Sequence, residues 1–316
     1  MHPYPSSGVV GYDRAQDDLT PPGRQSRRAR PVGRPTLVWG LNVRTLAVIN
    51  RKGGSGKTTT AVNTAAALAE LRLPVLLIDL DPQGSASEWL DRSGKNDQAM
   101  FQAVMSTADL ERLATPTGTP GLDLIPATPW LVTAERSLLG ELSLGVQRAI
   151  QGLPKRWAFV IVDCPPSLSY LSIGVLMGVR ELVIPVEAHG MAVTGAHAII
   201  DELPSVRSLN PHLQSLYLLP CRVTRTLHAQ SVVDTLVADY PDIVTRTRIR
   251  ETIKLAEAAA AHEPITTYAP KSVGSVDYRA FARELLGPDL APEPADENGS
   301  ERGWLRQLVT RSVGSR

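Results

Sequence analysis

Cysteine is scarce in this sequence, with only Cys164 and Cys221 among 316 residues. So small a number argues against a disulfide-stabilised scaffold and fits a reducing cytoplasm. Two separated cysteines are also too few for a zinc site or an iron–sulfur cluster, so we expect both to be buried thiols. No apolar run reaches the length of a membrane-spanning helix, and the N-terminus lacks the apolar core of a signal peptide.

An excess of charge of one sign is also lacking, because 33 Lys and Arg against 32 Asp and Glu give a formal net charge of +1. Any affinity for nucleic acid must therefore come from a local basic patch. Lysine itself is rare, yet two of the six lysines, Lys52 and Lys57, lie in one short loop. With 43% hydrophobic residues, the chain can build one large α/β domain or two small ones.

That loop, residues 50–60, reads Asn-Arg-Lys-Gly-Gly-Ser-Gly-Lys-Thr-Thr-Thr and lies between a β-rich run at 45–49 and a helix-like run at 61–71. Strand, glycine-rich loop and helix form the context of a phosphate-binding loop, in which backbone N–H groups and the helix N-terminus face one anion. The alternative, a glycine-rich turn with solvated lysines, would need neither the preceding strand nor the following helix. The loop residues predicted to contact the nucleotide are Gly53, Gly54, Ser55, Gly56, Lys57, Thr58 and Thr59. Lys57 is predicted to contact the β- and γ-phosphates, and Thr58 to help hold Mg²⁺.

The loop departs from the common phosphate-loop pattern, because Arg51 stands where the first glycine is expected and Lys52 precedes a glycine pair. The run Lys-Gly-Gly-Ser-Gly-Lys-Thr-Thr at 52–59 resembles the deviant Walker A motif of the ParA/MinD family of ATPases. The resemblance implies that Lys52 reaches across a dimer interface to the partner's nucleotide. Spacing alone shows only a second cation beside the phosphate site. Further matches to the family lie at 122–126, 184–186, 255–258 and 268–274.

From residue 44, apolar strands alternate with amphipathic helices, which predicts an α/β fold with a doubly wound, mostly parallel sheet flanked by helices, as in P-loop NTPases. Strands are expected at 45–49, 75–79, 121–126, 158–163, 181–186 and 216–221. Helices are expected at 61–71, 85–90, 97–105, 109–113, 192–209, 229–239, 253–262 and 276–286, and one or two more at 131–152.

The segments that flank this pattern differ in composition, which predicts four parts. Residues 1–43 are expected to be a disordered basic arm that could contact DNA or acidic lipid, or could simply be a solubilising tail. Residues 44–287 are the expected ATPase domain, and 288–300 a linker rich in proline and acid. Residues 301–316 are expected to be a short amphipathic, basic helix or tail. Its apolar residues at helical spacing, with arginines between them, are Trp304, Leu305, Leu308, Val309 and Val313.

Three carboxylates lie at the carboxyl ends of predicted strands, where open parallel sheets bind their ligands. Asp79 and Asp81 follow one strand, and Asp163 ends the most apolar one. Such carboxylates suit Mg²⁺, which keeps several waters and needs few protein ligands. One aspartate alone would equally fit an ordinary turn. The resemblance implies that Asp81 orients the attacking water, that Asp79 is a partner on the Mg²⁺ side, and that Asp163 is the Walker B aspartate.

Basic residues late in the chain suggest a second surface. The resemblance implies that Arg225 and Lys254 match positions that bind DNA in bacterial ParA proteins. Further basic residues near them in sequence are Arg222, Arg246, Arg248, Arg250 and Lys271. The alternative is a solvated, charged face, because sequence does not show that these side chains converge. Residues 249–252 depart from the family's usual run, so contacts to the base stay unassigned.

Together with these features, the resemblance implies a cytoplasmic, nucleoid-associated ATPase of the ParA type that uses ATP and Mg²⁺, forms a homodimer with ATP and binds DNA without sequence preference. A ParB-like partner would stimulate it to move or position a chromosome, plasmid or other cargo. Asp-Pro-Gln-Gly at 81–84 favours the ParA branch. One alternative is a MinD-like, membrane-associated positioning ATPase that uses the C-terminal segment. Another is a DNA-binding regulator that is switched by ATP without hydrolysing it, against which Lys57 and Asp81 argue.

Overall fold

A computed structural model describes residues 43–91, 99–105, 110–132, 139–166, 169–189 and 192–287. All of them belong to one compact unit, residues 32–316. The predicted linker and C-terminal helix, and the predicted arm apart from Val43, lie outside the described residues, and those predictions stay open. No helix within the described ranges combines the length and apolar character needed to cross a membrane.

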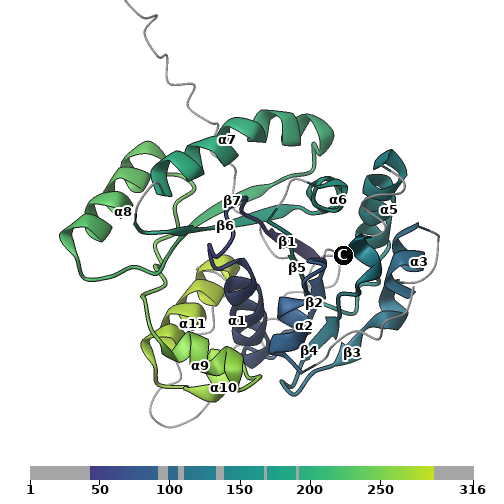
Figure 1. Cartoon of the computed structure of the whole chain (residues 1–316), viewed down its shortest axis with the longest axis horizontal. Coiled ribbons are helices and arrows are strands. Elements are labelled where there is room, and N and C mark those ends of the chain that lie inside the picture. The colour runs from purple at the N-terminus through teal and green to yellow at the C-terminus, as the bar shows by residue number, and fades with distance from the viewer. Residues whose placement is uncertain are drawn as a thin grey trace, which may run out of the picture. The chain divides into compact units, whose positions relative to one another are not determined.

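The described strands form one seven-stranded sheet in the order β3-β4-β2-β5-β1-β6-β7 (Figure 1). Neighbouring strands are parallel, except that β3 runs antiparallel to β4. The strands are β1 (Arg44–Val48), β2 (Val75–Asp79), β3 (Thr115–Pro116), β4 (Leu122–Ile125), β5 (Phe159–Asp163), β6 (Glu181–Glu187) and β7 (Ser215–Cys221). This arrangement confirms the predicted doubly wound, mostly parallel sheet.

Helices cover both faces of the sheet (Figure 1). One face carries α1 (Lys57–Glu70), α2 (Ser85–Trp89), α9 (Lys254–Ala260), α10 (Ile265–Tyr268) and α11 (Val273–Leu286). The other carries α3 (Ala99–Met105), η1 (Leu110–Leu113), α5 (Leu139–Gln151), α6 (Tyr170–Gly178), α7 (Ala192–Leu209) and α8 (Leu227–Asp239). Because both faces are covered, the central strands read as continuous apolar runs, which made them easy to predict.

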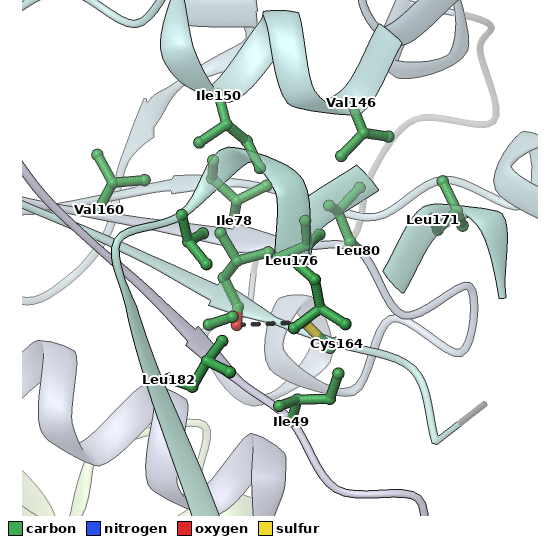
Figure 2. Close-up of a cluster of buried hydrophobic side chains, with 14 of the residues drawn as sticks. Ile49, Ile78, Leu80, Val146, Ile150, Val160, Cys164, Leu171, Leu176 and Leu182 are labelled. Carbon is green, nitrogen blue, oxygen red and sulfur yellow. Dashed lines mark hydrogen bonds between the residues drawn. The ribbon is translucent and has the colours of Figure 1, made fainter. Parts of the chain in front are cut away.

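The core on the α5–α6 side shows how the sheet is covered (Figure 2). Val160 of β5 and Ile78 of β2 lie in one buried cluster with Ile150 of α5 and Leu176 of α6. The two helices approach closely through glycine: a Cβ at Gly174 would lie 2.6 Å from the Ser143 carbonyl oxygen. A larger residue there would push α6 away from α5 and open this core.

Both cysteines are free and buried, as the sequence analysis expected. Cys164 lies in the cluster of Figure 2, where its Sγ is 3.8 Å from the Val162 carbonyl oxygen. Burial raises the pKa of Cys164 well above its usual value and that of Cys221 to about 12. Both therefore stay protonated near neutral pH and behave as small apolar residues.

Three short or apolar elements escaped the sequence analysis: β3, α6 and α10. Helix α6 is buried on most sides and has almost no polar face, so the 3.6-residue periodicity that predicts a helix is absent. Helix α1 begins at Lys57, earlier than the predicted residue 61, because its first turn is part of the glycine-rich loop. The threonines of that turn have low helix propensity, which hid the true start.

A buried ion pair joins the starts of β1 and β6. The side chains of Arg44 and Glu181 are 5% and 1% exposed and bond to each other, and Arg44 Nη1 donates to the Leu285 carbonyl oxygen at 2.6 Å. Burial alone would lower the pKa of Arg44, but the Glu181 carboxylate raises it overall. The arginine therefore stays charged and ties α11 to the sheet.

We expect Glu181→Ala to lower the free energy of unfolding by about 3–5 kcal/mol, because it leaves the Arg44 charge buried without its partner. The double variant Arg44→Met, Glu181→Leu should recover most of that loss. Urea unfolding of the three proteins tests this. The matched control is Glu111→Ala at the exposed Arg156–Glu111 pair, which should change stability by less than about 1 kcal/mol. An equal loss at both sites would contradict the prediction.

Candidate functional site

The glycine-rich loop connects β1 to α1 at the carboxyl edge of the sheet. Gly54 and Gly56 have φ angles of 76° and 87°, a conformation that residues with a Cβ rarely adopt. Apart from the two adjoining residues, no atom lies within 4 Å of where a Cβ would stand at Gly53, Gly54 or Gly56. Backbone conformation rather than crowding therefore requires glycine at Gly54 and Gly56. The loop thus leaves open space beside its backbone, as a phosphate cradle needs.

The end of the loop carries positive potential that no acid of the first helical turn offsets. Gly56, the N-cap of α1, offers no side-chain cap, and the first turn contains no Asp or Glu. Ser55 Oγ is buried without a hydrogen-bond partner in the described structure. Free N–H groups, the positive helix end and an unsatisfied hydroxyl converge here, which suits an anion with several oxygens.

Lys57 opens α1 and is only 7% exposed. Its Nζ donates to the Lys52 carbonyl oxygen at 3.4 Å, so the side chain runs back over the loop. Burial lowers the pKa of Lys57, while the nearby charges of Asp163 and Asp81 act in the opposite direction. A phosphate group would replace the solvation that this ammonium lost on folding.

Asp163 ends β5 and is fully buried next to the loop. The Thr58 hydroxyl donates to its Oδ2 at 2.7 Å, while Oδ1 has no partner in the described structure. Burial raises the pKa of Asp163 well above its usual value, and the charge of Asp79 adds to the effect. A cation bound at Thr58 would compensate the charge of the buried Asp163 carboxylate, so the residues fit Mg²⁺. The described residues contain no group of three metal-binding side chains, so phosphate oxygens and water would have to complete its ligands.

Asp79 ends β2, and Asp81 lies on the loop that follows it. Asp79 is fully buried, and burial raises its pKa to about 6. Its oxygens accept from the Asp81 N–H at 3.2 Å and from the Ser87 N–H and hydroxyl at 2.8 and 2.7 Å. Asp79 therefore anchors the loop between β2 and α2, and its predicted place beside Mg²⁺ stays a prediction. Asp81 accepts from the Gln83 N–H at 3.0 Å, which orders the turn that follows it.

Lys52 is 64% exposed, and its Nζ lies 2.7 Å from Glu187 Oε2 at the end of β6. Arg222 holds the other oxygen of that carboxylate at 2.8 Å. Burial would raise the pKa of Glu187, but the hydrogen bonds from Lys52 and Arg222 outweigh it and lower the pKa. In the single chain, Lys52 is thus engaged by its own protomer. Asn50 fixes the loop beside β6, because its Nδ2 donates to the Pro185 carbonyl oxygen at 2.7 Å.

Glu187 was missed by the sequence analysis, although a signal for it exists. It stands at the carboxyl end of a buried strand, the same position that singled out Asp79 and Asp163. The predicted strand stopped one residue short of it. The structure therefore adds Glu187 to the carboxylates that surround the loop.

The two residues predicted to bind DNA lie on neighbouring segments. A backbone bridge between Val223 and Arg250 pairs the segment that carries Arg225 with the one that leads to Lys254. Arg225 is exposed and forms no ion pair within the described part of the chain. Lys254 Nζ lies 2.6 Å from Glu257 Oε2, which neutralises part of its charge. Their roles stay predictions.

Acidic partners also reduce the charge of the surrounding basic residues. Arg222 pairs with Glu187 and Glu251, Arg246 with Glu284, and Arg250 with Asp277. Arg248 instead donates to Gln230 Oε1 at 3.2 Å. The surface near Arg225 is thus less basic than the sequence suggests, and Arg225 and Arg248 are its arginines without an acidic partner in the described structure.

Comparison with known proteins gives evidence that does not depend on the geometry of the site. A family profile described as an AAA domain matches residues 43–215. The chain is 39% identical over 246 residues to the chromosome-partitioning ATPase Soj of Thermus thermophilus, which covers 77% of this chain and 96% of that protein. It is 31% identical to the chromosome partitioning protein ParA of Myxococcus xanthus, over 85% and 97% of the two chains. The structure of cobyrinic acid a,c-diamide synthase from Mycobacterium smegmatis with bound ADP and magnesium aligns with a TM-score of 0.66 and 29% identity, over 78% of this chain and 94% of that chain.

Proposed function

The chain belongs to the ParA/MinD family of P-loop ATPases, and from that premise we propose that it is a DNA-partition ATPase of the ParA type. It would bind and hydrolyse ATP with Mg²⁺, form a homodimer around the nucleotide, and bind DNA without sequence preference in that state. Hydrolysis, stimulated by a ParB-like partner, would release the DNA. Its cargo would be a chromosome, a plasmid or another large assembly.

The observation that carries the nucleotide proposal is the contact between Thr58 and Asp163 beside the open loop. The backbone N–H groups of residues 53–59 and Lys57 would hold the phosphates, and Thr58 would hold the metal with Asp163 behind it. When bound, Mg²⁺ supplies positive charge beside the β- and γ-phosphates. Lys57 would neutralise the charge that develops on the transferred group, and Asp81 would orient the attacking water.

The dimer proposal rests on the open side of the loop. Lys52, Gly53 and Gly54 are exposed in the single chain, so the face of the loop that would cover a nucleotide faces solvent. A partner protomer could close this face and exclude water from the phosphates. For Lys52 to reach the partner's nucleotide, its contact with Glu187 must first break. Dimerisation would therefore exchange an ion pair within one protomer for a contact between two.

We expect DNA binding to depend on ATP, because pairing two protomers doubles the number of phosphate contacts that one modest basic surface supplies. Arg225→Ala should weaken binding and reduce the salt dependence by about one contact. Lys254→Ala should have a smaller effect, because Glu257 already offsets that charge. Fluorescence anisotropy on unrelated duplexes with ATP, ADP or no nucleotide measures these affinities over a range of salt concentrations.

The matched control for this prediction is Arg156→Gln, which removes a basic residue that already pairs with Glu111 and precedes β5 at the other edge of the sheet. It should leave DNA affinity unchanged. Sedimentation with ATP should show that all three variants still dimerise. Equal affinity in the three nucleotide states, or indifference to Arg225→Ala, would overturn the proposed DNA cycle while leaving the nucleotide site untouched.

A further inference from the structure

A cavity of about 400 Å³ lies at the amino edge of the sheet, opposite the edge from which the glycine-rich loop leaves β1. Val43 and Arg180 directly precede β1 and β6, Lys155 lies before β5, and His212 lies before β7. Because these four strands are parallel, all of these residues lie at the same edge. The cavity is lined by Val43, Thr45, Ile150, Gln151, Leu153, Lys155, Gly178, Val179, Arg180, Asn210 and His212.

The charged residues that line this cavity, Lys155 and Arg180, are both basic. His212 also lines it, and none of its lining residues is an acid. The nearest carboxylate in sequence, Glu181, gives both of its oxygens to Arg44. The cavity therefore contains cationic groups that no acidic residue of its lining compensates.

Arg180 is held in place by its backbone rather than by its side chain. Its N–H donates to the Thr45 carbonyl oxygen at 3.1 Å and to the Thr45 hydroxyl at 3.0 Å. Its carbonyl oxygen accepts from the Gln214 N–H at 2.7 Å. Arg180 is half-buried, and in the described part of the chain its guanidinium forms no hydrogen bond or ion pair. These bonds thus fix the main chain of Arg180 beside the cavity and leave the donors of its guanidinium free.

One effect opposes an anion at this place. Helices α5, α6 and α7 end at this edge, and a helix C-terminus carries about half a negative charge. At the end of α6, two carbonyl oxygens that contribute to this charge already accept hydrogen bonds: Asn210 Nδ2 donates to the Leu176 and Val179 carbonyl oxygens at 2.8 and 2.6 Å. Lys155 and Arg180 carry full charges on flexible stems, so they can approach a ligand more closely than the helix ends. The two full positive charges therefore outweigh the partial negative charge of the helix ends, and the cavity favours an anion.

We propose that this cavity binds a small organic phosphate. Its volume lies in the range of small-molecule sites, and the side chains of Ile150, Leu153 and Val179 offer an apolar wall for the body of the ligand. The guanidinium of Arg180 matches the geometry of two phosphate oxygens, and Lys155 adds a second charge. This site is separate from the glycine-rich loop, so the proposal does not depend on the ATPase cycle.

The test is isothermal titration of the full chain, first saturated with Mg-ADP so that the loop is occupied. The titrants are AMP, inorganic phosphate and, as a carboxylate of similar charge, citrate. We expect AMP to bind, and Arg180→Gln and Lys155→Gln to weaken it by at least about tenfold each, the effect of losing one charge-assisted hydrogen bond. Lys271→Gln, at an exposed lysine outside the cavity, should leave AMP affinity unchanged.

Lys57→Ala separates the two sites, because a ligand of the cavity should bind that variant as tightly as the wild type. Thermal unfolding without ligand should show that Arg180→Gln remains folded, since the backbone contacts of Arg180 do not involve its side chain. Absence of AMP binding, a loss of binding only in Lys57→Ala, or binding by the Arg180 and Lys155 variants as tight as that of the wild type would overturn the proposal. Tighter binding of citrate than of AMP would overturn its phosphate chemistry.

Discussion

Replacing Lys57 with alanine is expected to abolish ATP binding, with an affinity loss of at least about 100-fold. The reason is the direction and burial of the side chain: Lys57 is 7% exposed and runs back over the loop toward the Lys52 carbonyl oxygen. Lys52 itself is exposed and directed at Glu187, so it does not substitute for the missing charge. Isothermal titration with Mg-ATP measures the loss directly.

The variant should remain folded, because burial already disfavours the charged form of Lys57, as its lowered pKa shows. Removing that charge should therefore leave thermal stability without nucleotide unchanged or slightly higher. ATP should raise the unfolding temperature of the wild type and not that of Lys57→Ala. An unchanged ATP affinity in a folded Lys57→Ala protein would show that the loop is not the nucleotide site.

The strands and the loop could be predicted because their signals are local. Val75–Asp79 was predicted with the bounds that the structure has, and Phe159–Asp163 to within one residue, since a strand covered on both faces needs apolar residues throughout. The seven predicted loop residues lie together because they are consecutive in the sequence. Helix α6 was missed because a helix buried on most sides carries no periodic polar signal.

Contacts between distant segments could not be predicted. Glu187 meets Lys52 over a sequence separation of 135 residues, and only the order of β1 and β6 in the sheet places them together. The contacts of Asp79 are local, because Ser87 and Asp81 use its oxygens, yet they could not be predicted either. Sequence showed a carboxylate at a strand end, but not whether that carboxylate would face a ligand or its own chain. Burial and hydrogen bonding decide between these roles, and both depend on the complete fold.

The second large effect is expected at Lys52. Lys52→Ala should still bind ATP, because the phosphate contacts proposed for Lys57 and the loop backbone do not involve the Lys52 side chain. It should neither dimerise nor hydrolyse ATP, because the target proposed for Lys52 lies in the other protomer. Asp81→Ala is the matched control: it should dimerise with ATP and stay dimeric, since it loses only the group proposed to orient water. Sedimentation velocity with ATP and a phosphate-release assay measure both properties.

The contact between Lys52 and Glu187 within one protomer offers a competing explanation that Glu187→Gln can separate. If Lys52 served only to hold Glu187, removing either partner would have the same effect, and Glu187→Gln would lose dimerisation like Lys52→Ala. If Lys52 instead leaves Glu187 to reach the partner protomer, a neutral amide holds it less tightly, since the ion pair is weakened. Glu187→Gln should then dimerise with ATP at lower protein concentration than the wild type. Opposite shifts for the two variants support the role across the interface, whereas a shared loss, or a Lys52→Ala protein that dimerises and hydrolyses ATP, refutes it.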